Sequence, residues 1–309
     1  MAIRLGLGLP QNQQYDIGRD VPDVARAAEE TGYDSLWVYE RALFPEPAGQ
    51  GLYGIEGMPW PDSYRGVAEP LTTLALAVTA TRRVRLGTSV LVAPLHGPFQ
   101  LAKALATLDA ASGGRIVAGL GTGWSHDEYA AAGVRPFEER GRVLDEIIDV
   151  CRAVWGPDPV SYEGGLTRIS SAAVAPKPAR PIPVLLAATT KRAQRRLVDK
   201  ADGWIPVGLG PEVLAGQLRA LEELAEEQGR VEPLQTVLRA NAAYTARDHA
   251  GADRGPFQGS VNQIVADLAA HAEVGVDEIL VDLQGSVRDA RELTDVAAQL
   301  YTTVRAAGL

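Results

Sequence analysis

The sequence is poor in side chains that carry sulfur, imidazole or amine chemistry. Its 309 residues include one cysteine, Cys151, four histidines and only four lysines. A single cysteine excludes a disulfide within the chain, and the apolar helical surroundings of Cys151 indicate packing rather than nucleophilic catalysis. The histidines include no pair at the spacing of metal ligands on a helix, so we expect no metal site; they are His96, His126, His249 and His271.

Long hydrophobic runs are missing as well. No segment approaches the roughly 18 continuous apolar residues of a membrane-spanning helix, and the N-terminus MAIRLGLGLP lacks the basic and apolar regions of a secretion signal. Acidic residues outnumber basic ones by 39 to 30, and the formal net charge of −9 argues against nucleic acid and anionic membranes as partners. We therefore expect a cytoplasmic protein that acts on a small molecule.

Strand-like and helix-like runs alternate along the whole chain. The strand-like runs are mostly apolar rather than strictly alternating, which is typical of parallel strands that are covered on both faces. Eight strand–helix pairs predict an α/β fold, a single (β/α)8 TIM barrel over residues 1–309, with a doubly wound sheet as the alternative. The strands are expected at residues 3–9, 34–39, 84–92, 115–121, 183–188, 203–208, 235–244 and 277–283.

Two insertions interrupt this alternation. Residues 42–68, after the second strand, are rich in glycine, proline and aromatic residues. A loop of that length in a compact domain is typical of a lid or a binding loop. Residues 156–182, before the fifth strand, contain VSYEGGLTRIS. The turn residues Gly164 and Gly165 within it predict a β-hairpin.

Small and hydroxyl side chains are expected at the functional face, where the barrel strands end. These residues are Thr88, Ser89, Val90, Gly121, Thr122, Gly123, Ala188, Thr189, Thr190 and Lys191. Such a floor suits a flat, extended ligand that the backbone approaches closely. Three larger side chains join it, namely Glu40 and Arg41 after the second strand and Trp124 after the fourth.

Two of these strand ends have features of phosphate sites. GLGTGW places glycines after a strand, but its spacing differs from a dinucleotide fingerprint and residues 125–133 are not expected to open a helix at once, so a tight turn explains it better. Thr189 and Thr190 can cap a helix whose free N–H groups, together with Lys191, suit a phosphate. An ordinary helix cap with a solvated basic face is the alternative.

The strand ends offer no evident nucleophile or metal site. No lysine lies within an expected strand, which argues against a Schiff-base barrel. Carboxylates do not cluster at the strand ends, which argues against a divalent metal. His96 and His126 follow the third and fourth strands, where they either line the mouth or lie in plain surface loops. These exclusions leave a barrel with room for a planar anionic cofactor that carries the hard chemistry.

Six segments spread over nearly the whole chain carry a family resemblance. They are DSLWVYER, EPLTTLALAVTATRRVRLGTSVLVAP, LAKALATLDAASGGRIVAGLGTGW, FEERGRVLDEIIDVCRAVW, PVLLAATTKRAQRRLVDKADGWIPVG and GSVNQIVADLAAHAEVGVDEILVDL. Together they resemble the bacterial luciferase-like monooxygenase superfamily, and within it the branch of coenzyme F420-dependent oxidoreductases found in actinobacteria.

The resemblance implies where a cofactor binds. In F420-binding members the third strand carries a bulge with a non-proline cis peptide that supports the central deazaflavin ring, and the match falls on Ser89-Val90. The family also implies phosphate binding by the loops after the fourth and fifth strands, which match Gly121 to Gly123 and Ala188 to Thr190, with Trp204 nearby. It further implies a homodimer.

The chain departs from the family pattern at three places. Many relatives have two glycines where this chain has Ala187-Ala188, which leaves a tighter phosphate pocket. Enzymes of the branch that act on sugar phosphates have Asp-His where this chain has Glu40-Arg41, and a glutamate where it has Trp124. These differences argue against a histidine base and against a sugar phosphate as substrate.

The leading hypothesis is an F420-dependent oxidoreductase that passes a hydride between C5 of the deazaflavin and a carbon of a small organic substrate under the loop 42–68. Glu40 is expected to orient the ring or relay a proton, and Arg41 to hold the substrate or the Glu40 carboxylate. A salt bridge that only pins the loop is the alternative for this pair. Two other functions remain open: an FMN-dependent monooxygenase that receives reduced flavin from a partner reductase, and a non-catalytic barrel that binds flavin or F420.

Overall fold

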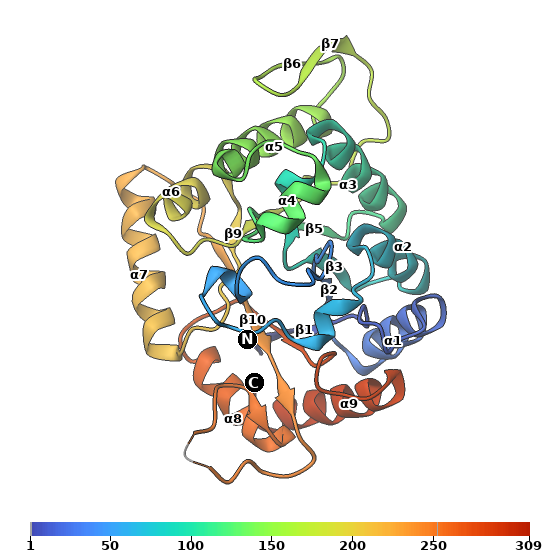
Figure 1. The fold of residues 1–309 in the computed structure, drawn as a ribbon, viewed down its shortest axis with the longest axis vertical. Coiled ribbons are helices and arrows are strands. Elements are labelled where there is room, and N and C mark those ends of the chain that lie inside the picture. Colours follow the sequence, from blue (N-terminus) through green and yellow to red (C-terminus); the bar gives the residue numbers. More distant parts are fainter. Residues whose placement is uncertain (1, 252) are drawn as a thin grey trace.

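Parallel strands close into a barrel in the computed structural model, which describes residues 2–251 and 253–309 (Figure 1). Every pairing within the barrel is parallel, and β3 pairs with β5 to close the ring, so the TIM barrel is confirmed and the doubly wound sheet is wrong. In ring order the strands are β3 (Arg85–Thr88), β2 (Ser35–Val38), β1 (Arg4–Gly8), β13 (Glu278–Asp282), β10 (Gln235–Asn241), β9 (Gly203–Trp204), β8 (Val184–Leu186), β5 (Ile116–Gly121) and β4 (Leu91–Val92).

Helices surround the barrel, one after each strand position (Figure 1). Local signals fix their ends: Gly113 ends α3 in the left-handed conformation, with a φ of 73°, and Asp289 caps α9 by accepting from the Glu292 amide. No helix of the described part of the chain is long and apolar enough to cross a membrane. The surrounding helices are α1 (Ile17–Thr31), α2 (Pro70–Ala80), α3 (Pro98–Ser112), α5 (Arg140–Trp155), α6 (Lys191–Lys200), α7 (Pro211–Glu227), α8 (Val261–Ala272) and α9 (Ala290–Ala306).

An additional short helix, α4 (His126–Ala132), follows β5. The expectation that no helix opens here at once is wrong. The Ser125 side chain accepts a hydrogen bond from the Glu128 amide at 3.3 Å, and Asp127 and Glu128 place negative charge in the first turn. Both features stabilise a helix N-terminus. Short 3₁₀ turns also lie at Leu52–Gly54, Asp62–Arg65, Ala93–Leu95 and Phe137–Glu139.

Two of the expected strands are divided. The third breaks between β3 and β4, and the Ser89-Val90 peptide at the break is cis, as the resemblance implied. The seventh ends at Asn241, and beyond it β11 (Ala243–Tyr244) pairs with β12 (Gln258–Gly259) outside the barrel.

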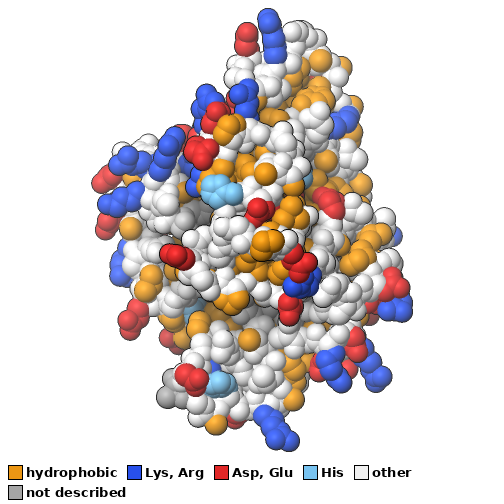
Figure 2. Space-filling view, viewed as in Figure 1, with side chains coloured by type: hydrophobic (Ala, Val, Ile, Leu, Met, Phe, Trp, Pro, Cys, Tyr) orange, Lys and Arg blue, Asp and Glu red, His pale blue; other side chains and the backbone are white. Residues whose placement is uncertain are grey.

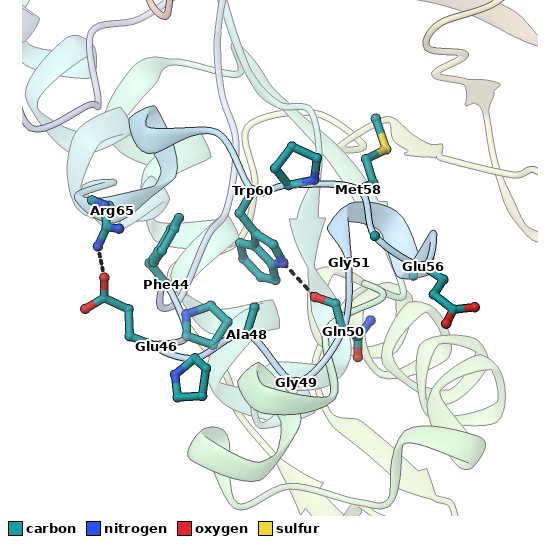
Figure 3. Close-up of a pocket in the computed structure, with 15 residues that line it drawn as sticks. Phe44, Glu46, Ala48, Gly49, Gln50, Gly51, Glu56, Met58, Trp60 and Arg65 are labelled. Atoms are coloured by element: carbon teal, nitrogen blue, oxygen red, sulfur yellow. Dashed lines mark hydrogen bonds and ion pairs between the residues drawn. The ribbon is translucent and has the colours of Figure 1, made fainter.

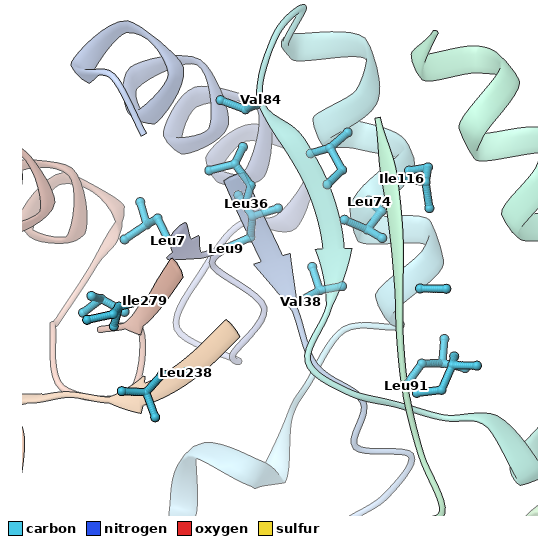
Figure 4. Packing of buried hydrophobic residues seen from close by; sticks show 14 of the residues in the cluster. Leu7, Leu9, Leu36, Val38, Leu74, Val84, Leu91, Ile116, Leu238 and Ile279 are labelled. Atoms are coloured by element: carbon cyan, nitrogen blue, oxygen red, sulfur yellow. The ribbon is translucent and has the colours of Figure 1, made fainter. Parts of the chain in front are cut away.

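Hydrophobic residues fill two separate layers. Leu36 and Val38 point outward from β2 into the layer between barrel and helices (Figure 4). Trp37, between them, points into the barrel. Gly6 leaves room for its indole, because a Cβ at Gly6 would lie 2.6 Å from Trp37 Nε1. The interior layer consists of Trp37, Val117, Leu185, Ile205, Val237 and Leu280, with Val90 packed against it.

The two insertions lie on different parts of the molecule. The predicted hairpin is formed by β6 (Val160–Glu163) and β7 (Arg168–Ala172), which pair antiparallel and project at the edge, beyond α5 (Figure 1). Residues 42–68 instead cross the carboxyl ends of the barrel strands (Figure 1). Their far end is anchored where Val67 bridges to Asn12.

Candidate active site

Inward-facing side chains form a polar layer across the mouth of the barrel. Val237 and Leu280 belong to the interior layer, so Arg239 and Asp282, two residues further along β10 and β13, face the same way. Tyr39 follows β2 in the same manner and is buried. Burial raises the pKa of the Tyr39 phenol, so its hydroxyl stays protonated. The barrel is therefore packed below this layer, and a ligand has to lie above it.

Arg239 spans the mouth. β10 and β3 stand opposite each other in the ring, with three strand positions between them in either direction, yet Nη1 of Arg239 donates to the Ser89 carbonyl. Nη2 pairs with Asp282 of the neighbouring strand, and Nε donates to Asn241 Oδ1 at 2.8 Å. The guanidinium also lies 5.1 Å from the centre of the Tyr39 ring. The guanidinium of Arg239 thus lies across the mouth, where three acceptors and an aromatic ring fix its position.

Val90 forms an apolar part of the floor beside Arg239. It is partly exposed and packs on the interior layer. A Cβ at Gly121 would lie 2.6 Å from Val90 Cγ2, and one at Gly123 would lie 2.6 Å from Val92 Cγ1. Glycine is therefore required at both positions because the two valine side chains pack against them. A close approach of the ligand to the backbone is not needed to explain these glycines. Thr88 faces away from any ligand, because its buried hydroxyl donates to the Gly119 carbonyl at 2.6 Å.

Glu40 is buried and held by partners on the next strand position. Its Oε2 accepts from the Val92 amide at 2.5 Å, and its Oε1 lies 2.8 Å from His96 Nε2. Burial lowers the pKa of His96, but the hydrogen bond and the negative charge of Glu40 outweigh burial and raise it above its ordinary value. The structure thus brings His96 to the mouth as the partner of Glu40.

Arg41 pairs with Glu128 of α4 rather than with the Glu40 carboxylate, so the expectation that it holds that carboxylate is wrong. Arg41 Nη1 lies 3.4 Å from Glu128 Oε2, and both side chains are more than nine-tenths buried. Burial raises the pKa of Glu128, and the charge of Arg41 opposes that rise. Among the described residues, Arg41 Nε and Nη1 and Glu128 Oε2 have no hydrogen-bond partner. Buried polar groups without partners are costly, which makes this pair a candidate ligand contact.

Aromatic rings surround the Arg41 guanidinium. It lies 4.8 Å from the ring centre of Trp124 and 5.4 Å from those of Trp60 and Tyr64. Trp60 also packs on Trp124, with their ring centres 4.7 Å apart. The predicted residue Trp124 therefore forms an apolar wall above the mouth, together with residues of the segment 42–68.

The segment 42–68 is attached to the start of α4. Gln50 Nε2 donates to the Trp124 carbonyl at 2.7 Å, and Gln50 Oε1 accepts from the His126 amide at 3.0 Å. The Trp60 indole in turn donates to the Gln50 carbonyl at 2.9 Å (Figure 3). The segment lines an open hollow of about 840 Å³, at whose edge Arg65 pairs with Glu46 (Figure 3).

The end of β8 carries an exposed basic helix start. Thr190 caps α6, and its hydroxyl accepts from the Ala193 amide at 3.2 Å, as predicted. Thr189 and Lys191 are exposed beside it, whereas Ala188 is buried. Because helix N-termini attract anions, this end keeps its suitability for a phosphate.

Trp204 lies apart from the other predicted residues. It is the last residue of the short strand β9, belongs to the outer hydrophobic layer and lines a hollow beside Leu218 and Leu221 of α7. Ile205, the next residue, points into the barrel instead. One step along a strand changes the face, so Trp204 points away from the mouth.

The sequence also carries signals for site residues beyond those predicted above. Arg239 and Asp282 are charged residues near the ends of otherwise apolar strand runs, and alternation from the interior layer places both inward. Glu128 could be found from the Ser125 cap signal three residues before it. His126, for which a place at the mouth and a place on the surface were both open, is exposed and packs on Phe137, with ring centres 4.0 Å apart.

Comparisons with known proteins agree with this architecture. An uncharacterized protein of Mycobacterium tuberculosis is 36% identical over 185 residues, which cover 59% of this chain and 65% of the relative. An F420-dependent glucose-6-phosphate dehydrogenase of Amycolatopsis mediterranei is 32% identical over 238 residues, which cover 75% of this chain and 66% of that enzyme. The chain thus matches just under two thirds of the length of each relative.

A solved structure and a family profile extend the comparison to most of the chain. The structure of an F420-dependent secondary alcohol dehydrogenase in complex with an F420–acetone adduct superposes with a TM-score of 0.78 at 18% identity, covering 99% of this chain and 100% of that one, which shows a shared fold. The profile of the family described as luciferase-like monooxygenase matches residues 4–278. The chain therefore belongs to the luciferase-like monooxygenase family.

Proposed function

We propose that the protein is an F420-dependent oxidoreductase that passes a hydride between coenzyme F420 and a carbon of a small organic substrate. The observation that carries the proposal is the floor of the mouth, where the partly exposed Val90 lies on the interior layer and Arg239 spans the barrel beside it. A flat ring system can rest on such a surface. The name of the relative from Amycolatopsis, an F420-dependent dehydrogenase, supports the choice of cofactor.

The residues around the floor fit a planar cofactor with an anionic tail. The exposed segment Thr189 to Lys191 at the start of α6 suits the phosphate of that tail. When bound, the deazaflavin supplies a carbon that accepts or donates a hydride, that is, one hydrogen nucleus with two electrons. The chain itself has to hold the ring, orient the substrate and exchange one proton with it.

The buried Arg41 is suited to hold the substrate. Its Nε and Nη1 groups await an acceptor, and the rings of Trp60 and Trp124 favour an apolar body beside that acceptor. An oxygen of the substrate can accept from the guanidinium, which stabilises negative charge that develops there. Glu128 balances the charge of Arg41 while the site is empty of substrate.

Glu40 and His96 are suited to move the proton. Arg41 stands where relatives have a histidine, which argued against a histidine base, but His96, which follows β4 and contacts Glu40, offers another imidazole. His96 Nε2 lies 2.8 Å from Glu40 Oε1, and the imidazole side chain is 24% exposed, so it can exchange a proton with solvent. Because the carboxylate raises the pKa of His96, the pair carries a proton nearer neutral pH than a free imidazole does. The segment 42–68 acts as a lid that keeps water from the hydride.

A fluorescence titration of the purified protein with F420 and, separately, with FMN tests the proposal. Tight binding of F420 with weak or absent binding of FMN is the expected result. Tight binding of FMN alone overturns it in favour of a monooxygenase that uses reduced flavin, a function that the name of the family favours. Binding of F420 without turnover of any alcohol, aldehyde or other small organic substrate would point to a non-catalytic barrel.

A further inference from the structure

The Arg239 side chain spans the centre of the barrel mouth, between β10 and the opposite side of the ring. Its three nitrogens contact three different elements: the Ser89 carbonyl between β3 and β4, Asp282 at the end of β13 and Asn241 at the end of β10 itself. The planar fork of a guanidinium can serve three acceptors at once, which an ammonium group cannot do in this geometry.

The Ser89 carbonyl is the group that directly precedes Val90 in the backbone. The surrounding strand fixes the other backbone groups of this turn: the Ser89 amide donates to the Val38 carbonyl at 2.7 Å, and the Val90 carbonyl accepts from the Glu40 amide at 3.2 Å. Both of these bonds come from β2 and the residues just after it. Arg239 holds the turn from the opposite side of the barrel.

We propose that Arg239 is a positioning residue that holds Val90 in place as the floor for the cofactor ring, with Asp282 and Asn241 fixing the guanidinium. The inference rests on the proposed function for the identity of the ring, but its mechanical part concerns this chain alone. Side chains held by several partners lose little freedom when a ligand arrives, and such preorganisation raises affinity. Arg239 acts through the Ser89 carbonyl.

A second ion pair of β13, at the amino ends of the strands, offers a matched control substitution. Arg85 of β3 pairs with Glu278, which lies on β13 four residues before Asp282. Both ion pairs thus join β13 to another barrel strand. The pair of Arg85 and Glu278 lies at the amino ends of the strands. Among the described residues, the pair of Arg239 and Asp282 is the only ion pair between β13 and another barrel strand that lies at the carboxyl ends, on the side of the site. A variant of either arginine removes one such ion pair.

The test compares Arg239→Met with Arg85→Met by fluorescence titration of the intact protein with F420 and FMN. We expect Arg239→Met to raise the Kd of the cofactor that the wild-type protein binds at least tenfold, whereas Arg85→Met leaves it within threefold, even where both variants lower the melting temperature. Equal effects of the two variants on Kd, or a Kd within threefold for Arg239→Met, overturn the inference. If Arg239→Met does not fold, Arg239→Lys replaces it, and the same tenfold limit applies because one ammonium cannot serve the three acceptors.

A readout without cofactor separates this inference from the proposed function. The methyl NMR signals of Val90 should shift or broaden in the Arg239 variant and stay in place in Arg85→Met. Unchanged Val90 signals in the Arg239 variant refute the positioning role, whatever the protein binds. Absence of both F420 and FMN binding in the wild-type protein, with displaced Val90 signals in the variant, refutes the proposed function and leaves the positioning of Val90 supported.

Discussion

At the scale of single residues, the charged groups of the mouth form separate pairs rather than one network. Glu40 pairs with His96, Arg41 with Glu128, and Arg239 with Asp282. A residue can therefore be changed in one pair while the contacts of the other two pairs persist. This separation makes the role of each charge accessible to single substitutions.

Glu40→Gln is expected to lower turnover about 10²-fold or more while cofactor affinity changes little. The amide keeps the size of the side chain and an oxygen that can accept from the Val92 amide, but it cannot take up the proton that His96 exchanges. Steady-state kinetics with a substrate of the enzyme, together with a cofactor titration, measure both quantities. Turnover within a few-fold of the wild-type value would mean that the carboxylate only holds β4.

The pH dependence of stability provides a control for this variant. Glu40 and, at longer range, Glu69 raise the pKa of His96 in the folded protein, so the wild-type protein gains stability from protonated His96 at low pH and loses that gain as the pH rises through the folded-state pKa. Glu40→Gln removes most of the gain. Its melting temperature should equal that of the wild type near pH 8 and fall below it near pH 6. Equal melting temperatures at both values would show that the pair does not share a proton.

At the scale of elements, the segment 42–68 differs from the barrel that it covers. It holds three exposed apolar side chains, Tyr53, Ile55 and Met58, on a face whose charged side chains lie mostly toward the outline (Figure 2). It is fastened to the residue Trp124 before α4 through a few groups: Gln50 donates to the Trp124 carbonyl, and the Trp60 ring packs on the Trp124 ring. Segments with few buried contacts open at low free-energy cost, which suits a lid.

Replacement of residues 45–59 by a short glycine–serine linker is expected to lower turnover far more than cofactor affinity. The change removes Gln50 and exposes the guanidinium of Arg41 to water, whereas Val90 and Arg239 below it keep their contacts. Kinetics and cofactor titration on the same preparation check the split. Shortening the hairpin at residues 163–168, which lies away from the mouth, is the matched control and should leave both quantities unchanged. Similar losses of turnover and affinity in the lid variant would show that the segment is part of the cofactor wall.

The elements were predictable from the sequence where a single physical signal dominates. Apolar runs and caps located the barrel strands and their helices, and the hairpin followed from its two glycines. The family resemblance placed Trp204 near the phosphate-binding loops, but Trp204 belongs to the outer layer, and Ile205, one residue further along, takes the inward position. The alternation of β10 could place Arg239 inward, but its contact with Ser89 could not be predicted, because the two residues are 150 positions apart and only the closed ring brings them together.

At the scale of the whole molecule, the site rests on the hydrophobic side chains that fill the barrel interior beneath its mouth. Trp37 is the largest side chain of the interior layer and is 1% exposed. Its indole donates to Ser35 Oγ at 2.6 Å, and Ser35 in turn bonds to Glu278 near the amino ends of the strands. The polar layer of Arg239 and Asp282 rests above it. Removal of a side chain from the interior layer should therefore lower the stability of the fold more than it changes the site directly.

Trp37→Ala is expected to lower the free energy of unfolding by about 3–5 kcal/mol, the range for truncation of a large buried aromatic residue. The barrel cannot collapse into the space, since hydrogen bonds link its strands into a closed ring and Gly6 and Gly87 offer no side chains to fill it. Chemical denaturation monitored by circular dichroism measures the change. Trp155→Ala, at a partly buried tryptophan of the outer helix α5, should cost clearly less because solvent and neighbouring side chains can take its place. A loss below about 1 kcal/mol for Trp37→Ala would contradict the view that the interior layer supports the mouth.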